Sequence, residues 1–115
     1  MVVRDYKYEL NDILMAIDFI TAFTEGMDFA AFQKDPRTIA AVERNLIVLV
    51  ESARRLGDQA EILCPDIAWD NIRGIRQWLQ PEFHTSLVES LWHIMQNDLQ
   101  PLWRSALRAV TAPSS

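Results

Sequence analysis

Two arginines and a histidine between residues 65 and 84 are the side chains best suited to chemistry on a phosphodiester. Arg73 and Arg76 are three residues apart, so on a helix they share one face. A guanidinium can stabilise charge on a phosphoryl oxygen, and the imidazole of His84 can move the proton of an attacking or leaving hydroxyl. These three side chains therefore form a candidate site for phosphodiester cleavage.

Each of these residues also has a plainer interpretation. The arginines can lie on a solvated helix face, paired with Asp70 or Glu82. Gly74, between them, argues against that view, because glycine inside a helix costs about 1 kcal/mol relative to alanine. We expect Gly74 to mark a close approach of two helices, as at a subunit interface. Pro81 breaks the helix before His84, which can equally be a surface histidine preceding a helix cap.

The elements that would position these side chains are helices. Apolar residues recur at spacings of three and four over residues 5–25 and again over 36–56, which predicts two long helices. The second pattern resembles a coiled-coil seam. Asp35 and Pro36 are suited to open this second helix, and Gly57 to end it.

Further helices and turns complete the predicted fold. Short turns are expected at residues 28–34 (capped by Asp28) and 58–64, and helices beginning at Asp70, at Thr85 or Ser86, and at Pro101. The chain has no internal repeat and no glycine-rich phosphate loop. The sequence thus predicts an all-α, antiparallel bundle of four to five helices. It forms one domain over residues 1–110, and residues 111–115 form a flexible tail.

The composition limits the classes of partner. Half of the 115 residues are hydrophobic, which is more apolar surface than so short a chain can bury alone. We therefore expect a homodimer, with its interface on the helices near residues 39–56 and 70–80. The net charge of −5 argues against a standing basic surface for DNA. No apolar run has the length of a membrane span and no signal peptide is evident, so we expect a cytoplasmic protein without membrane contact.

Metal and cofactor chemistry has little support in the sequence. A single cysteine, Cys64, cannot form an intrachain disulfide or a cysteine-rich zinc site, and we expect it to be buried and inert. His93 is expected to be structural, so no metal and no cofactor is predicted. The four tryptophans are assigned to packing. Trp78, between Arg76 and Pro81, is the one tryptophan for which base stacking is a real alternative.

Three segments together suggest a family. These are Ala-Trp-Asp-Asn-Ile-Arg-Gly-Ile-Arg at 68–76, Asp-Pro-Arg-Thr-Ile-Ala-Ala-Val-Glu-Arg-Asn-Leu at 35–46, and the run from Thr-Ser-Leu-Val-Glu to Asp-Leu-Gln-Pro-Leu at 85–102. In this order they resemble HEPN-domain proteins of the HepT type, and the resemblance covers nearly the whole chain. It implies an all-α homodimer that serves as the toxin of a type II/VII-like toxin–antitoxin pair. Active members cleave RNA without a metal. The implied partner is a minimal nucleotidyltransferase, which in some pairs adenylylates the toxin on a tyrosine.

The resemblance also assigns residues, and here the chain departs from the family. The family motif is an arginine, usually a polar residue after it, a histidine four to six residues on, and a tyrosine two beyond. Arg76 and Gln77 match its beginning. Pro81 stands at the histidine position and Phe83 at the tyrosine position. Proline cannot transfer a proton and phenylalanine cannot accept an adenylyl group. His84 is the candidate substitute.

Glu51 matches a glutamate that recurs in the family, and we expect it either to orient Arg73 or Arg76 in a buried network or to face solvent. The predicted site thus has Arg76 and His84 as catalytic residues, and Arg73, Gln77 and Glu51 as RNA-binding or orienting residues. The expected function is a toxin subunit whose RNA cleavage is weak or lost. The alternative is a non-catalytic helical dimer that binds a nucleotidyltransferase.

Overall fold

A computed structural model describes residues 6–79 and 84–112, with only the backbone for 84–86. Within these ranges the chain forms seven helices and no strand, which confirms the all-α prediction. The helices are α1 (Lys7–Phe23), α2 (Phe29–Gln33), α3 (Pro36–Leu56), α4 (Gln59–Leu63), α5 (Trp69–Trp78), α6 (His84–Asn97) and α7 (Leu99–Thr111). None of the helices in the described ranges is both long and apolar enough to cross a membrane.

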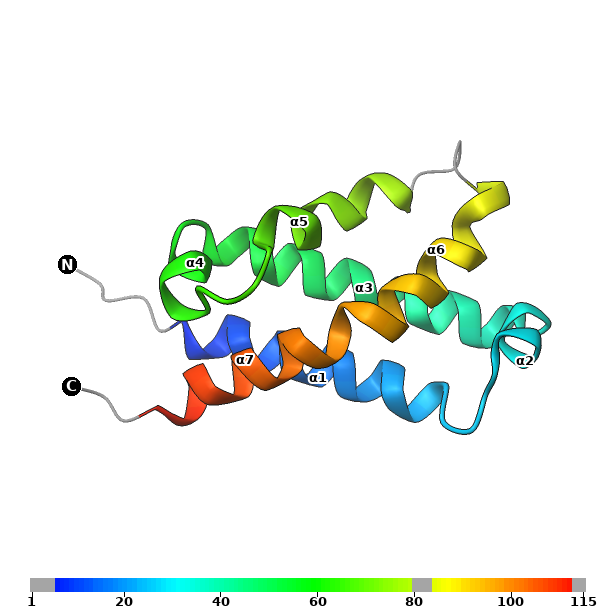
Figure 1. Ribbon diagram of the computed structural model, residues 1–115, viewed down its shortest axis with the longest axis horizontal. Helices are drawn as coiled ribbons and strands as arrows, with labels where there is room; N and C mark the ends of the chain where they lie inside the picture. The colour runs from blue at the N-terminus through cyan, green and yellow to red at the C-terminus, as the bar shows by residue number, and fades with distance from the viewer. Residues whose placement is uncertain (1–5, 80–83, 113–115) are drawn as a thin grey trace.

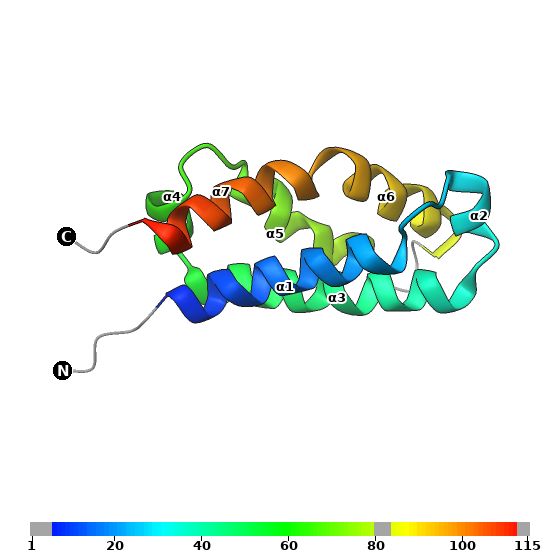
Figure 2. The ribbon, with the colours of Figure 1, turned by 90° about the horizontal axis from the view of Figure 1, so that it is seen from below.

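The helices form two layers. The long helices α1 and α3 lie side by side and antiparallel in one layer, and α4 to α7 cover them in the other (Figure 2). In the second layer α5 runs along α3, and α6 and α7 return in the opposite direction toward the start of α1 (Figure 1). The predicted antiparallel bundle is therefore correct, with two one-turn helices added to five longer ones.

Several helix ends follow the local sequence signals. The Asp28 carboxylate accepts a hydrogen bond from the backbone N–H of Ala31 at 2.8 Å, and that of Asp35 accepts one from Thr38 at 3.1 Å. Each aspartate thus satisfies a backbone donor that the first turn leaves unpaired. At its other end α3 stops at Gly57, whose φ of 55° suits a residue without a Cβ atom.

The predicted start of α5 is wrong by one residue. Trp69 is the first helical residue and Ala68 occupies the N-cap position, so Asp70 lies inside the first turn. The reason is tertiary: the Trp69 side chain is buried, and its indole nitrogen donates a 3.0 Å hydrogen bond to the carbonyl of Cys64. Burial of a large ring outweighs a cap worth about 1 kcal/mol.

The last two helices also begin earlier than predicted. The helix α6 starts at His84, so Thr85 and Ser86 lie within it instead of capping it, because both residue types are also tolerated in a first turn. The helix α7 starts at Leu99, which places Pro101 in the first turn, where a missing N–H leaves no bond unmade. Thr111 still belongs to α7, and residues 113–115 of the predicted tail lie outside the described residues.

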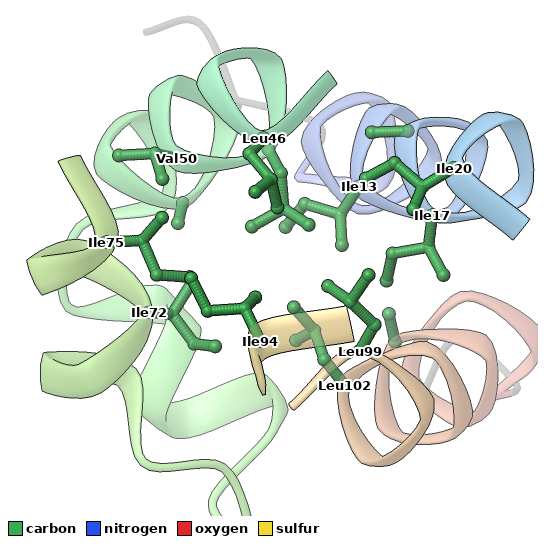
Figure 3. Packing of buried hydrophobic residues seen from close by; sticks show 14 of the residues in the cluster. Ile13, Ile17, Ile20, Leu46, Val50, Ile72, Ile75, Ile94, Leu99 and Leu102 are labelled. Carbon is green, nitrogen blue, oxygen red and sulfur yellow. The ribbon is translucent and has the colours of Figure 1, made fainter. Parts of the chain in front are cut away.

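The core lies between the two layers. Side chains from α1, α3, α5, α6 and α7 converge there, as Figure 3 shows for Ile13, Ile17, Ile20, Leu46, Val50, Ile72, Ile75, Ile94, Leu99 and Leu102. The seam on α3 that resembled a coiled coil is therefore part of this intramolecular core. The apolar residues that α3 exposes to solvent are a different pair, Ile47 and Val48.

Candidate functional site

Arg76 pairs with Glu51, and this contact joins α5 to α3. Nη1 of Arg76 donates a hydrogen bond to Oε1 of Glu51, while Oε2 of Glu51 accepts one from Nη2 of Arg54 at 2.9 Å. The Arg76 side chain is 59% exposed and that of Glu51 26%. Two positions were expected for Glu51, in a buried network that orients an arginine or facing solvent. The structure combines parts of both, because Glu51 contacts Arg76 in a partly exposed ion pair.

Arg73 is held far more completely than Arg76. Its two terminal nitrogens donate to the two carboxylate oxygens of Glu61 at 2.8 and 2.9 Å, and Nη2 also donates to the carbonyl of Gly57 at 3.0 Å. The Asp70 carboxylate, one of the two partners expected for a solvated face, lies 3.4 Å from Nη1. Arg73 therefore ties α5 to α4 and to the end of α3, and a phosphate would have to break this cluster to reach it.

The electrostatics of this cluster follow its geometry. The hydrogen bonds from Arg73 lower the pKa of Glu61, because they favour the ionised carboxylate. The same bonds raise the pKa of Arg73, which stays charged at every accessible pH. The Arg73 side chain is 29% exposed and that of Glu61 50%, so solvent screens the pair and its contribution to stability is modest.

The other flank of α5 faces α6 across a cleft. Gly74, Gln77 and Trp78 lie on one wall, and His93 lies on the other. Gln77 thus lines this cleft and Arg76 does not, although the sequence placed both in one site. A Cβ atom on Gly74 would meet nothing within 4 Å, so the close helix approach predicted there does not occur within this chain.

The placement of His84 relative to Arg76 stays a prediction. His84 is the first residue of α6, but its side chain lies outside the described residues. Glu82, Pro81 and Phe83 lie outside them as well. The catalytic roles of Arg76 and His84 and the RNA-binding or orienting roles of Arg73, Gln77 and Glu51 stay predictions. The structure adds that Arg73 is engaged by Glu61 and the Gly57 carbonyl and that Gln77 lines the cleft.

Sequence reasoning set His93 aside, yet it lines the cleft. The amide of Asn97 lies 3.2 Å from its Nδ1. A signal was present in the sequence: Glu89, Ser90 and His93 recur at the spacing of one helix face. Within the described parts of the chain, no three histidine, cysteine or acidic side chains gather to hold a metal ion.

Cys64 and the tryptophans other than Trp78 have the packing contacts predicted for them. Cys64 is buried, and burial raises the pKa of its thiol. The ring of Trp92 packs at a tilt against that of Phe32, with centroids 5.5 Å apart, and the indole N–H of Trp103 donates to the Asp18 carboxylate at 3.0 Å. Trp78 is the exception, with 40% of its surface exposed beside the cleft.

Comparison with known proteins identifies the family. The model of the family described as "Ribonuclease HepT-like" matches residues 13–109, which include all of α3 to α6 and the candidate site. The chain belongs to the HepT-like ribonuclease family. "Probable ribonuclease HepT" of Thermococcus cleftensis is 30% identical over 99 residues, which cover 86% of this chain and 90% of that protein. No solved structure gives a significant match.

A second relative matches a similar stretch. "Putative RNase MJ0127" of Methanocaldococcus jannaschii is 31% identical over 94 residues, 82% of this chain and 78% of that protein. The resemblance to HEPN proteins of the HepT type drawn from the sequence is thereby confirmed. The matched HepT-like region includes Arg76, Pro81 and Phe83, and the roles that the resemblance assigns to these three positions stay predictions.

Proposed function

We propose that this HepT-like chain is the toxin subunit of a type II/VII-like toxin–antitoxin pair, acting in the cytoplasm, with a nucleotidyltransferase antitoxin as partner and with RNA cleavage that is weak or lost. The family supports RNA as the substrate class. The proposal of weak or lost RNA cleavage is carried by one observation: Arg76 is accessible and, among the described residues, pairs only with Glu51, while the resemblance places Pro81 at the position of the motif histidine.

Arg76 retains what phosphate binding requires. It lies on a regular helix, is always charged and has most of its side chain in solvent. A phosphate can reach it by displacing the Glu51 carboxylate, and exposed ion pairs of this kind contribute only about 0–1 kcal/mol. Proton transfer is what the motif lacks, because proline offers no titratable group. Binding without efficient cleavage is the expected result.

A second copy would complete the site. Ile47 and Val48 form an exposed apolar strip on α3, beside a shallow depression that Ala40 and Arg44 also line. This strip leads along the helix to Glu51, one turn further on. A homodimer formed through it would place two Arg76 side chains near one another. Light scattering should give twice the chain mass at micromolar concentration, and a monomer would contradict this part of the proposal.

The activity is tested with purified protein on a single-stranded RNA. We expect slow cleavage or binding alone for the wild type, complete loss in Arg76→Ala, and much of the signal retained in His84→Ala. Glu51→Gln should strengthen RNA binding several-fold, because no carboxylate then competes for Arg76. A robust activity that His84→Ala abolishes would show that the histidine has been relocated and that the chain is a working toxin.

The alternative function is a non-catalytic helical dimer that binds and regulates a nucleotidyltransferase. It is favoured by Phe83 at the tyrosine position, since a partner that adenylylates the motif tyrosine would find no hydroxyl there. Co-expression with a nucleotidyltransferase encoded beside this chain should leave its mass unchanged. A gain of adenylyl groups mapped to residues 78–90 would refute this expectation. Toxicity on expression without the partner would favour the catalytic proposal.

A further inference from the structure

A cleft of about 660 Å³ opens between α5 and α6, on the flank of α5 turned away from Arg73 and Arg76. Its floor is apolar, because the buried side chains of Ile75 and Ile94 close it toward the core. Gly74 keeps the α5 wall low, since no side chain projects from it. The cleft is therefore large enough for a side chain and a stretch of backbone, and Gln77 is the one residue of the predicted RNA site that lines it.

The charges in this cleft all have one sign. Asp70, Glu89 and Asp98 line it, and no lysine or arginine does so among the residues described. Asp70 is partly offset by Arg73. Glu89 and Asp98 form no ion pair with any other described residue of the chain. Two unpaired carboxylates around one opening repel phosphate, which excludes an RNA backbone, and favour a cation.

The uncharged side chains that line the cleft further restrict the class of ligand that it can bind. The exposed ring of Trp78 can accept a guanidinium or ammonium over its face, and the apolar floor suits the aliphatic stem of arginine or lysine. Asn71 and Gln77 add carboxamides at the rim. Their N–H groups need acceptors, which peptide carbonyls provide and a polyamine lacks.

We propose that the α5–α6 cleft binds an arginine- or lysine-bearing segment of a partner protein. The basic side chain reaches one of the two carboxylates, Glu89 or Asp98, with its stem over Ile75 and Ile94, and the segment's backbone bonds the amides at the rim. The two carboxylates are nine residues apart, about 13 Å along a helix, so two basic side chains of one segment can each reach one of them. This surface is separate from the flank that holds Arg76, so partner binding there leaves RNA access to Arg76 open. The inference holds whether or not the chain cleaves RNA.

The test uses the full chain and a fluorescein-labelled, amidated peptide of four Arg-Gly repeats, followed by fluorescence anisotropy at low ionic strength. Glu89→Gln combined with Asp98→Asn should weaken binding about tenfold or more. The matched control combines Asp12→Asn with Glu25→Gln, the same charge change at exposed sites outside the cleft, and should lose less than about twofold. Equal losses would show general attraction to an acidic protein and would overturn the proposal.

A second measurement keeps the proposal testable if the cleft variant does not fold. In ¹⁵N-labelled wild-type protein, the peptide should shift the amide signals of Gly74 and His93 and the indole signal of Trp78, assigned with Trp78→Phe. Spermidine at the same concentration should shift them less. Shifts of these signals that are as large with spermidine, or that appear with a short RNA, would assign the cleft to a different ligand and refute the inference.

Discussion

The two flanks of α5 differ in whether their charged side chains have partners of opposite charge. On one flank Arg73 and Arg76 face α3 and α4, and each is matched by a carboxylate, Glu61 or Glu51. On the other flank the carboxylates that meet across the cleft to α6 have no basic partner among the residues lining it. Whether a charged side chain on α5 forms an ion pair or stays free to bind a ligand therefore depends on which side chains the neighbouring helix places opposite it.

Both flanks depend on the apolar ridge that fixes α5 to the bundle. Ile75 is 3% exposed and lies between the arginine flank and the cleft. Ile75→Ala should lower the free energy of unfolding by about 2–5 kcal/mol, because it removes buried methyl groups and leaves a cavity. Urea unfolding at fixed protein concentration measures it. The control Ile62→Ala, at a site 67% exposed, should change it by less than about 0.5 kcal/mol. Similar losses in both variants would mean that α5 is not anchored by this ridge.

Substitution of Arg73 and of Arg76 should have different effects on the free energy of unfolding. Arg73→Met should lower the free energy of unfolding by about 1 kcal/mol, since it removes both hydrogen bonds to Glu61 and one of the two to the Gly57 carbonyl. Arg76→Met should change it by less than about 0.5 kcal/mol and should instead remove RNA binding. The same two variants serve as controls for each other in both assays. If Arg76→Met proves the more destabilising, its pair with Glu51 is a structural contact and the proposed site loses its basis.

Gly74 tests whether the cleft flank is covered in solution. Gly74→Ala should raise the free energy of unfolding by up to about 1 kcal/mol, because alanine favours the helix and its methyl group meets no atom within 4 Å. The contrasting variant Gly57→Ala should destabilise, because φ is 55° there. Size-exclusion chromatography accompanies the unfolding curves. A Gly74→Ala protein that dissociates would place this glycine at the subunit contact predicted from the sequence.

The smallest effect concerns pH. Arg73 holds the pKa of Glu61 below the ordinary 4.5, so the folded state keeps the carboxylate ionised where the unfolded chain protonates it. The resulting stabilisation is present in full above the ordinary pKa and is lost as the pH falls through the lowered value. The Tm difference between wild type and Glu61→Gln should therefore be constant near neutral pH and vanish in acid. Arg73→Met should remove this pH dependence, and a difference that grows in acid would contradict the assigned sign.

Much of the fold could be predicted because its signals are local. The spacing of apolar residues specified α1 and α3. Asp28 and Asp35 began helices and Gly57 ended one, through contacts or angles within one turn. The start of α5 escaped prediction because it depends on burial of Trp69 against Cys64, a tertiary contact. The one-sided cleft also escaped, since no property of α5 alone shows that α6 would bring Glu89 and His93 opposite it.

The sequence by itself determined that this is an all-α, HepT-like chain. Its resemblance to the family also predicts that Pro81 and Phe83 stand at the histidine and tyrosine positions of the motif. Only the tertiary structure decided which arginine is held in a cluster of hydrogen bonds and which has a single carboxylate partner among the described residues. The partners of Arg73 and Arg76 are 12 and 25 residues away in the chain, and periodicity along one helix cannot rank such contacts. The folded arrangement of α3, α4 and α5 bound one guanidinium tightly and left the other open to solvent.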